Sequence, residues 1–423
     1  MPNTISKEQA QRFLLKKHGL LGLSPFAGKA GIVAYVRQTG CVQYDPVDVC
    51  GKSHELAFFS RIKGFRQEML WELLYEERVL MDFWDKNMCL VLTEDWPYFE
   101  PVRRRYREDV RSREAIDAVA GAVRAHLKEH GHTSSQELPL EGKADWYWSE
   151  TALSRAALEC LYFRGELVVH HKKGTVKSYA LAEDCLPEAL LHAPNPCGTL
   201  EDQQAWQALR RIGAVGMLWN RASDAWLGMT EFTGKARSAV FARLEEEGAI
   251  MPVEVEGMGT PLYIRSRDEE LLLSCSKPHS GTKHVRFLAP LDCLMWDRKL
   301  IQALFGFSYK WEIYNPEHQR RFSYYVLPVI YGQRFAGRVE PICDRKAKAL
   351  IMRRFWAEKG FRDTPAFRAA MEAEAERLKE FHGLDEVRWE EGFWHNEPKD
   401  VSFGKGIGIK DDGSAGDDLS ILS

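Results

Sequence analysis

Two polar side chains in the stretch CVQYDPVDVC (residues 41–50) have types and a spacing that could do chemistry together. Gln43 and Asp45 stand two positions apart, so in a strand over residues 41–45 both would project from one face. Their Cα atoms would lie about 6.6 Å apart, which lets both side chains reach one water molecule. Pro46 favours an extended backbone before it and ends the strand. The alternatives are a solvent-facing strand edge or an aspartate cap on the following helix.

A carboxylate beside an amide suits hydrolysis of an N-glycosidic bond. The transition state carries positive charge on the sugar, which Asp45 would stabilise while accepting a proton from the attacking water. The amide of Gln43 would hold that water. No second, acidic carboxyl group is needed when the leaving base is already cationic, as N7-alkylguanine is. The strand has no lysine to form a Schiff base, which favours a monofunctional hydrolase over a bifunctional lyase.

The elements that must position this pair begin with a first unit at residues 1–113. Apolar periodicity predicts helices at 7–19 and 28–38, the catalytic strand at 41–45, and a long helical stretch over about 53–80. The strand between helices is compatible with a first copy of a winged helix.

Two later stretches repeat the element order of a winged helix, although no strict sequence repeat is present. Residues 114–186 and 198–270 each predict a helix, a short helix, a longer helix ending near a glycine, and a β-hairpin. The expected positions are a helix at 115–131, a short helix after Ser134 or Ser135, a helix at 149–167 and a hairpin at 167–181, then helices at 200–214, 219–226 and 230–250 and a hairpin at 251–265.

The remainder of the chain becomes rich in β-branched and aromatic residues. Residues 280–350 predict a β-rich domain, with a hairpin turn near Gly332. A C-terminal helical extension is expected at 351–400, followed by a flexible acidic tail at 401–423. We therefore predict an α+β fold, with about three tandem winged-helix domains followed by a β-rich, barrel-like domain.

Composition narrows the class of protein. The 423 residues are 45% hydrophobic and 28% charged, as in an ordinary soluble protein, and no run of about 18 apolar residues predicts a membrane span. Nine scattered cysteines without a CxxC motif fit a reducing cytoplasm and argue against a zinc site. The net charge is −3, but residues 361–423 hold 15 acidic and 8 basic side chains, which leaves the main body mildly basic. Its basic clusters lie at 103–107, 170–177 and 345–354 and could bind phosphate or be a solvated face.

Several blocks of the sequence resemble the winged-helix DNA glycosylase family that includes YcaQ and AlkZ. The stretch around Gln43 and Asp45 is similar to the Gln–x–Asp strand of the YcaQ-like branch, with Tyr44 in a middle slot where an aliphatic residue is common. We expect Tyr44 to face away from the site. The blocks that carry the resemblance are GCVQYDPVDV (40–49), SHELAFFSRI (53–62), EERVLMDFWDKNMCLV (76–91), LAPLDCLMWDR (288–298) and SYYVLPVIYGQRFAGRVEPICDRK (323–346).

The resemblance implies a DNA glycosylase that excises alkylated bases and unhooks interstrand crosslinks, with Gln43 and Asp45 as catalytic residues. It implies a duplex DNA substrate carrying alkylated or crosslinked guanine, no cofactor, no metal and no membrane partner. A cytoplasmic, nucleoid-associated monomer is the expected state. The competing hypothesis is a non-catalytic winged-helix DNA-binding protein or transcriptional regulator, which would have no need of the polar pair.

Five further side chains are candidate DNA contacts, each with a plainer alternative. Ser60 and Arg61 could hold a phosphate after the helix that begins near His54, and Arg338 could enter a groove from its hairpin. Alternatively, His54 is a packed or capping histidine, and Arg298 and Arg338 belong to internal salt bridges. Asp45, Asp48 and His54 could suggest a metal, but no second ligand cluster lies near them in the sequence.

Overall fold

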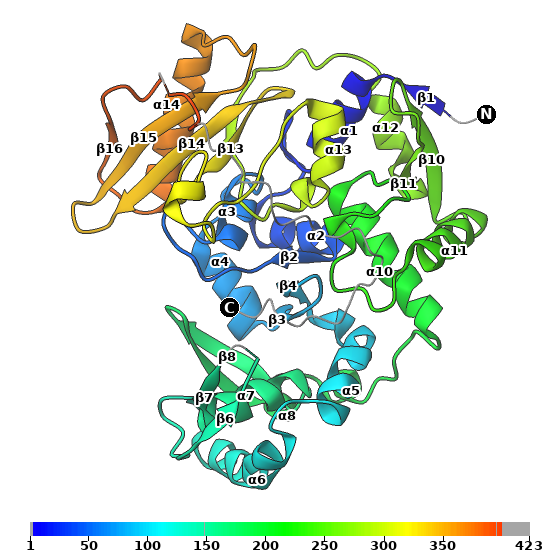
Figure 1. Cartoon of the computed structure of the whole chain (residues 1–423), viewed down its shortest axis with the longest axis vertical. Coiled ribbons are helices and arrows are strands. Elements are labelled where there is room, and N and C mark those ends of the chain that lie inside the picture. Colours follow the sequence, from blue (N-terminus) through cyan, green and yellow to red (C-terminus); the bar gives the residue numbers. More distant parts are fainter. Residues whose placement is uncertain (1–2, 148, 395, 400–423) are drawn as a thin grey trace.

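A computed structural model describes residues 3–147, 149–394 and 396–399 (Figure 1). The expected acidic tail at 401–423 lies outside the described residues. The predicted α+β class is confirmed, because helices and five separate small sheets alternate along the chain. No helix among the described residues is long and apolar enough to cross a membrane.

The first unit places the candidate pair at the end of a short strand. Helices α1 (Lys7–Lys17) and α2 (Gly28–Thr39) precede β2 (Cys41–Gln43), which pairs antiparallel with β4 (Met88–Leu92), and β4 pairs in turn with β3 (Leu80–Trp84). The strand is shorter than predicted: Asp45 lies beyond β2, although the Tyr44 N–H still donates to the Met88 carbonyl at 2.8 Å.

The predicted long helix over 53–80 is wrong. The chain forms α3 (Ser53–Phe59), α4 (Gln67–Trp71) and one π-helical turn (Glu72–Glu76) before β3 begins. The interruption includes Gly64 at φ +71°, a left-handed conformation that a continuous helix cannot contain. The break lets the residues after α3 turn into the core.

The second unit has the expected long helices and hairpin. After α5 (Glu100–Glu108) ends the first unit, the second contains α6 (Arg113–His130), α7 (Leu153–Phe163) and the hairpin of β8 (Leu167–Lys173) and β9 (Val176–Leu181). The short helix expected after Ser134 does not form. Instead β5 (His132–Ser134) joins β9 at the sheet edge, and β6 (Lys143–Asp145) pairs with β7 (Glu150–Ala152) ahead of α7.

The sheet of the third unit includes a strand from the start of the chain. Helix α10 (Leu200–Val215), a 3-10 turn (Asp224–Trp226) and α11 (Gly234–Glu246) lead into β10 (Ile250–Val255) and β11 (Leu262–Arg265). The third strand of this sheet is β1 (Asn3–Ile5), which runs parallel to β10. The N-terminal strand therefore belongs with the third unit and not with the expected domain at 1–113.

The C-terminal region is built on one five-stranded sheet of order β12-β13-β14-β15-β16. The expected boundary between residues 350 and 351 is wrong, because it would cut β15 and separate two strands and a helix from the sheet on which they pack. The elements are α12 (Glu269–Ser274), β12 (Val285–Phe287), α13 (Arg298–Phe305), β13 (Leu327–Tyr331), β14 (Arg334–Asp344), β15 (Ala349–Ala357), α14 (Pro365–Phe381) and β16 (Glu386–Trp389). The predicted turn at Gly332 is confirmed between β13 and β14.

The second unit lies below the first unit's sheet, with β8 packed against β3 (Figure 1). Buried polar contacts fix this docking. Lys172 of β8 forms an ion pair with Asp82 of β3, and the Tyr162 hydroxyl of α7 donates to the Asp82 carbonyl at 2.7 Å. Arg78 donates to the Val169 carbonyl at 2.8 Å. The hairpin and α7 are thereby held beside the end of β2.

Candidate active site

Gln43 and Asp45 both line one cavity of about 810 Å³, at the end of β2. Its walls come from residues 43–46 with the neighbouring turn before β4, from the second unit through the residues after β5, α7 and the β8–β9 hairpin, and from the C-terminal region through Leu291 and the irregular segment that follows α13. The side chains are mostly enclosed, with Gln43 7% and Asp45 8% exposed. The structure thus brings the two predicted residues to one surface, at which a small organic group could be bound.

The Asp45 carboxylate is held in place from two sides. Its Oδ1 accepts the Val47 N–H at 2.9 Å, and its Oδ2 accepts the Tyr314 hydroxyl at 3.4 Å. Burial raises the pKa of Asp45 above its ordinary value, and these two donors oppose the rise. The alternative in which Asp45 caps the next helix is wrong, because α3 begins after Lys52 and Asp45 closes its own turn.

Gln43 offers an acceptor to the same cavity. Its Oε1 is buried and accepts no hydrogen bond from the residues that the structure describes. Buried amide oxygens in folded proteins are nearly always paired with protein or water, so a buried acceptor in a cavity wall is a natural position for a bound water or substrate group. The backbone of Gln43 is fixed by its register opposite Cys89 of β4.

Tyr44 does not face away from the site as expected. It lines the cavity together with its two neighbours, because the strand ends at Gln43 and the alternation of faces ends with it. One side of its ring meets the His54 ring at a centroid distance of 4.8 Å, and the Lys172 ammonium lies 3.8 Å from its centroid. The Tyr44 ring is therefore held between His54 and Lys172.

His54 is part of this packing and is not at the surface. It is 5% exposed, and burial together with the positive charge of Lys172 and Lys52 holds its pKa well below the ordinary value. A neutral imidazole does not form an ion pair with Glu55, whose Oε1 lies 4.0 Å away. The expected role of His54 as a direct DNA contact is therefore not supported, and the plainer packed interpretation holds.

The cavity wall opposite β2 comes from the second unit. Arg155, Leu158 and Glu159 of α7 line it, as do Thr175 and Lys177 at the hairpin. Arg155 is well exposed and pairs with Glu159 at 3.0 Å. Helix α7 and the β8–β9 hairpin thus share one cavity with Asp45, and Arg155 and Lys177 bring basic groups to its wall.

Two aromatic residues of the site were missed by sequence reasoning. Trp311 and Tyr314 line the cavity from an irregular segment, and their rings contact each other at 5.9 Å. The Trp311 Nε1 is buried without a hydrogen-bond partner among the described residues. No strand or helix periodicity marks this segment, although its aromatic content in a loop-like stretch was a usable signal.

Ser60 and Arg61 are wrong as phosphate contacts in this structure. The Arg61 guanidinium is fully enclosed and forms an ion pair with Asp292 at 2.6 Å, while its Nε donates to the His18 carbonyl at 3.1 Å. The Ser60 hydroxyl donates to the Ala57 carbonyl at 3.1 Å and is also buried. Both side chains complete the interior where α3 ends.

Arg338 and Arg298 have different surroundings. Arg338 is buried, pairs with Glu358, donates to the Ser308 carbonyl and lies over the Phe322 ring at 4.2 Å, so its expected groove contact is wrong. Arg298 is exposed at the start of α13 and pairs with Asp224 at 2.6 Å. It lies outside the cavity wall, and its DNA contact stays a prediction.

Asp45, Asp48 and His54 do not form a metal site within the described ranges. Asp48 turns away from the cavity: its Oδ1 accepts the Gly51 N–H at 3.1 Å and the Arg345 guanidinium at 2.8 Å. The Asp45 carboxylate therefore faces the cavity, and the Asp48 carboxylate faces the C-terminal sheet. This separation agrees with the choice of Asp45 over Asp48.

The chain is similar to known proteins both in sequence family and in fold. A model of the AlkZ-like DNA glycosylase family matches residues 36–381, which include β2, the cavity and most of the C-terminal sheet. The fold is similar to that of the DNA glycosylase AlkZ of Streptomyces sahachiroi, with a TM-score of 0.60 over 92% of this chain and 99% of that chain. The two sequences are 16% identical, so this second likeness is one of fold.

Proposed function

The chain belongs to the AlkZ-like DNA glycosylase family and is a DNA glycosylase, and we propose that it hydrolyses the N-glycosidic bond of cationic N7-alkylguanine in double-stranded DNA. The observation that carries this proposal is the presence of Gln43 and Asp45, one amide and one carboxylate, in the wall of a single cavity. A regulator without catalysis would not need this pair, and the family match does not favour that alternative.

Asp45 acts on the sugar and the water. Its carboxylate stabilises the positive charge that develops as the bond to the base lengthens, and it accepts the proton of the attacking water. Gln43 accepts a hydrogen bond from that water through Oε1 and so orients an oxygen lone pair towards the sugar. The base departs as a neutral molecule because it enters cationic, which removes the need for a general acid.

DNA reaches the pair between the second unit and the first. Helix α7 and the β8–β9 hairpin stand where a winged helix holds its recognition helix and wing. Arg155 and Lys177 at the cavity rim provide phosphate contacts, and these replace the buried Arg61 and Arg338 in that role. The same site, acting on each alkylated guanine of an interstrand crosslink, would unhook it. We expect a monomer that works on the nucleoid.

The test compares leaving groups in one sequence context. Wild-type protein is incubated with duplexes containing 7-methylguanine, an N7-guanine interstrand crosslink, a neutral hypoxanthine, or undamaged guanine, and released base is measured by mass spectrometry. The proposal predicts release of the cationic base and unhooking of the crosslink, with no release of hypoxanthine or guanine. Release of the neutral base at a comparable rate would contradict selection by leaving group, and no release from any duplex would contradict the substrate class.

A further inference from the structure

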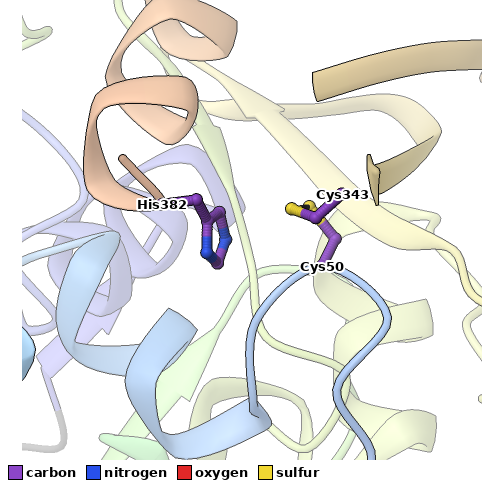
Figure 2. A group of neighbouring side chains, drawn as sticks. All are labelled: Cys50, Cys343 and His382. Carbon is purple, nitrogen blue, oxygen red and sulfur yellow. Dashed lines mark hydrogen bonds between the residues drawn. The ribbon is translucent and has the colours of Figure 1, made fainter. Parts of the chain in front are cut away.

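Three potential metal ligands meet on the side of the catalytic loop away from the cavity. They are Cys50 in the loop after β2, Cys343 at the end of β14 and His382 just after α14. One ligand atom from each lies within 4.8 Å of the others, and the two sulfur atoms are 3.1 Å apart. Figure 2 shows both sulfurs turned towards the imidazole ring. Segments separated by about three hundred residues thus converge on one point.

The group is enclosed and not fully satisfied by the protein. Both cysteine side chains are buried, and the Nε2 of His382 is buried without a hydrogen-bond partner among the described residues. An imidazole nitrogen in this state either costs free energy or has a ligand. A ligand is favoured here because two thiol sulfurs lie within 4.8 Å of a nitrogen of this ring.

The surrounding backbone is arranged to let the ring approach. Gly51 has φ +91°, and a Cβ at this position would lie 3.2 Å from the Cε1 of His382 and 3.0 Å from a Leu56 methyl. The Tyr325 hydroxyl donates to the Gly51 carbonyl at 2.8 Å, and the Cys343 N–H donates to the Val49 carbonyl at 3.3 Å. The ligands are therefore preorganised by contacts that do not depend on a bound ion.

The donor set selects the class of ion. Two thiolates and one imidazole suit zinc, with sulfur at about 2.3 Å and nitrogen at about 2.0 Å. Tetrahedral geometry at that bond length separates the two sulfurs by about 3.8 Å, so the pair must open by about 0.7 Å from its 3.1 Å contact. The fourth position would hold a water molecule, and both cysteines would bind as thiolates.

We propose that Cys50, Cys343 and His382 bind one zinc ion that fastens the loop between Asp45 and α3 to the C-terminal sheet and α14. No metal was expected from the sequence, because the cysteines form no CxxC motif and the three ligands have no local spacing. The ion would lie on the side of the loop away from the cavity and outside the proposed reaction, so this inference holds or fails independently of the substrate.

The test measures metal directly. Reduced full-length protein is stripped with a chelator, exchanged into metal-free buffer and titrated with zinc, and bound metal is counted by mass spectrometry after gel filtration. We expect equimolar zinc and a higher melting temperature in the wild type. Cys50→Ser, Cys343→Ser and His382→Gln should lose the bound zinc and the thermal shift. The matched control Cys275→Ser, a buried free cysteine outside the group, should keep both.

A second measurement does not depend on variants that fold. Cobalt added to the stripped wild type should give the near-ultraviolet absorption of cobalt bound to thiolate, and zinc should displace it. Stripped, reduced wild type that takes up neither ion overturns the proposal. So does equimolar zinc that all three substitutions leave in place. A Cys50–Cys343 disulfide in protein that binds no zinc after reduction would assign the pair to redox chemistry instead.

Discussion

The buried pair of Arg61 and Asp292 yields a prediction that separates two roles for the same arginine. Both side chains are fully enclosed, and their charged atoms lie 2.6 Å apart. Asp292→Asn keeps the oxygen that accepts the Leu294 N–H but removes the charge, which leaves the guanidinium buried without a counter-ion. Breaking such a pair from one side costs about 3–5 kcal/mol. Arg61→Met instead leaves the Asp292 carboxylate buried without its counter-ion, and it should lower the free energy of unfolding by a similar amount.

This loss of stability can be converted to a decrease in melting temperature. An unfolding entropy of about 2.1 cal/mol/K per residue, applied to 423 residues that unfold together, is about 0.9 kcal/mol/K. Each single variant should therefore melt about 3–6 °C lower in calorimetry. The double variant Arg61→Met/Asp292→Asn should lose less than the sum of the two, because neither charge is left alone.

The salt dependence of DNA binding distinguishes an interior Arg61 from one that contacts a phosphate. If Arg61 is interior, folded Arg61→Met should bind duplex DNA with an unchanged dependence on salt. If it held a phosphate, the slope of log affinity against log salt would become shallower by about 0.9, and the melting temperature would stay near that of the wild type. This second pattern would refute the structural assignment.

Further predictions concern the cavity. Tyr314→Phe removes a donor to Asp45, so excision should slow by about two- to tenfold and the acid limb of the rate profile should move to higher pH. Because burial raises the pKa of Asp45, excision by the wild type should fall, as pH is lowered, at a pH above the ordinary carboxylate range. The same raised pKa means that the ionised form opposes folding, so Asp45→Asn should melt higher than wild type at neutral pH and no higher in acid. Arg155→Gln and Lys177→Gln should each reduce the salt slope of duplex binding by about 0.9, whereas Arg388→Gln, exposed on β16 of the C-terminal sheet, should not.

Local signals predicted the parts of the fold that local chemistry determines. The hairpin at 167–181 and the turn at Gly332 were found because glycine turns and alternating strands mark them directly. The break after α3 was missed because the apolar residues that follow Phe59 keep a helix-compatible pattern while packing as an irregular segment. The partner strand β1 was missed because its pairing with β10 joins the two ends of a stretch of some 250 residues.

In the candidate site, too, local sequence predicted some residues, whereas contacts between distant residues were missed. The spacing of Gln43 and Asp45 made them candidates but left a strand edge or a helix cap open, and the resemblance of the surrounding blocks decided between these alternatives. The structure places both residues on one cavity. Arg61 was misassigned because its partner Asp292 lies 231 positions away, and an arginine at a helix end resembles a surface residue until that partner is known. Tyr314 was missed because its contact with Asp45 spans 269 positions and no regular periodicity marks its segment.

The role of Asp45 is tested most directly by single-turnover excision of 7-methylguanine from one defined duplex. Asp45→Asn keeps the size of the side chain and the acceptor for the Val47 N–H, and Asp48→Asn is the matched control five residues from the strand, where the carboxylate faces Arg345. We predict that Asp45→Asn loses excision by about a hundredfold or more, while binding the duplex as wild type does, and that Asp48→Asn retains the wild-type rate. Equal rates for wild type and Asp45→Asn would contradict the account.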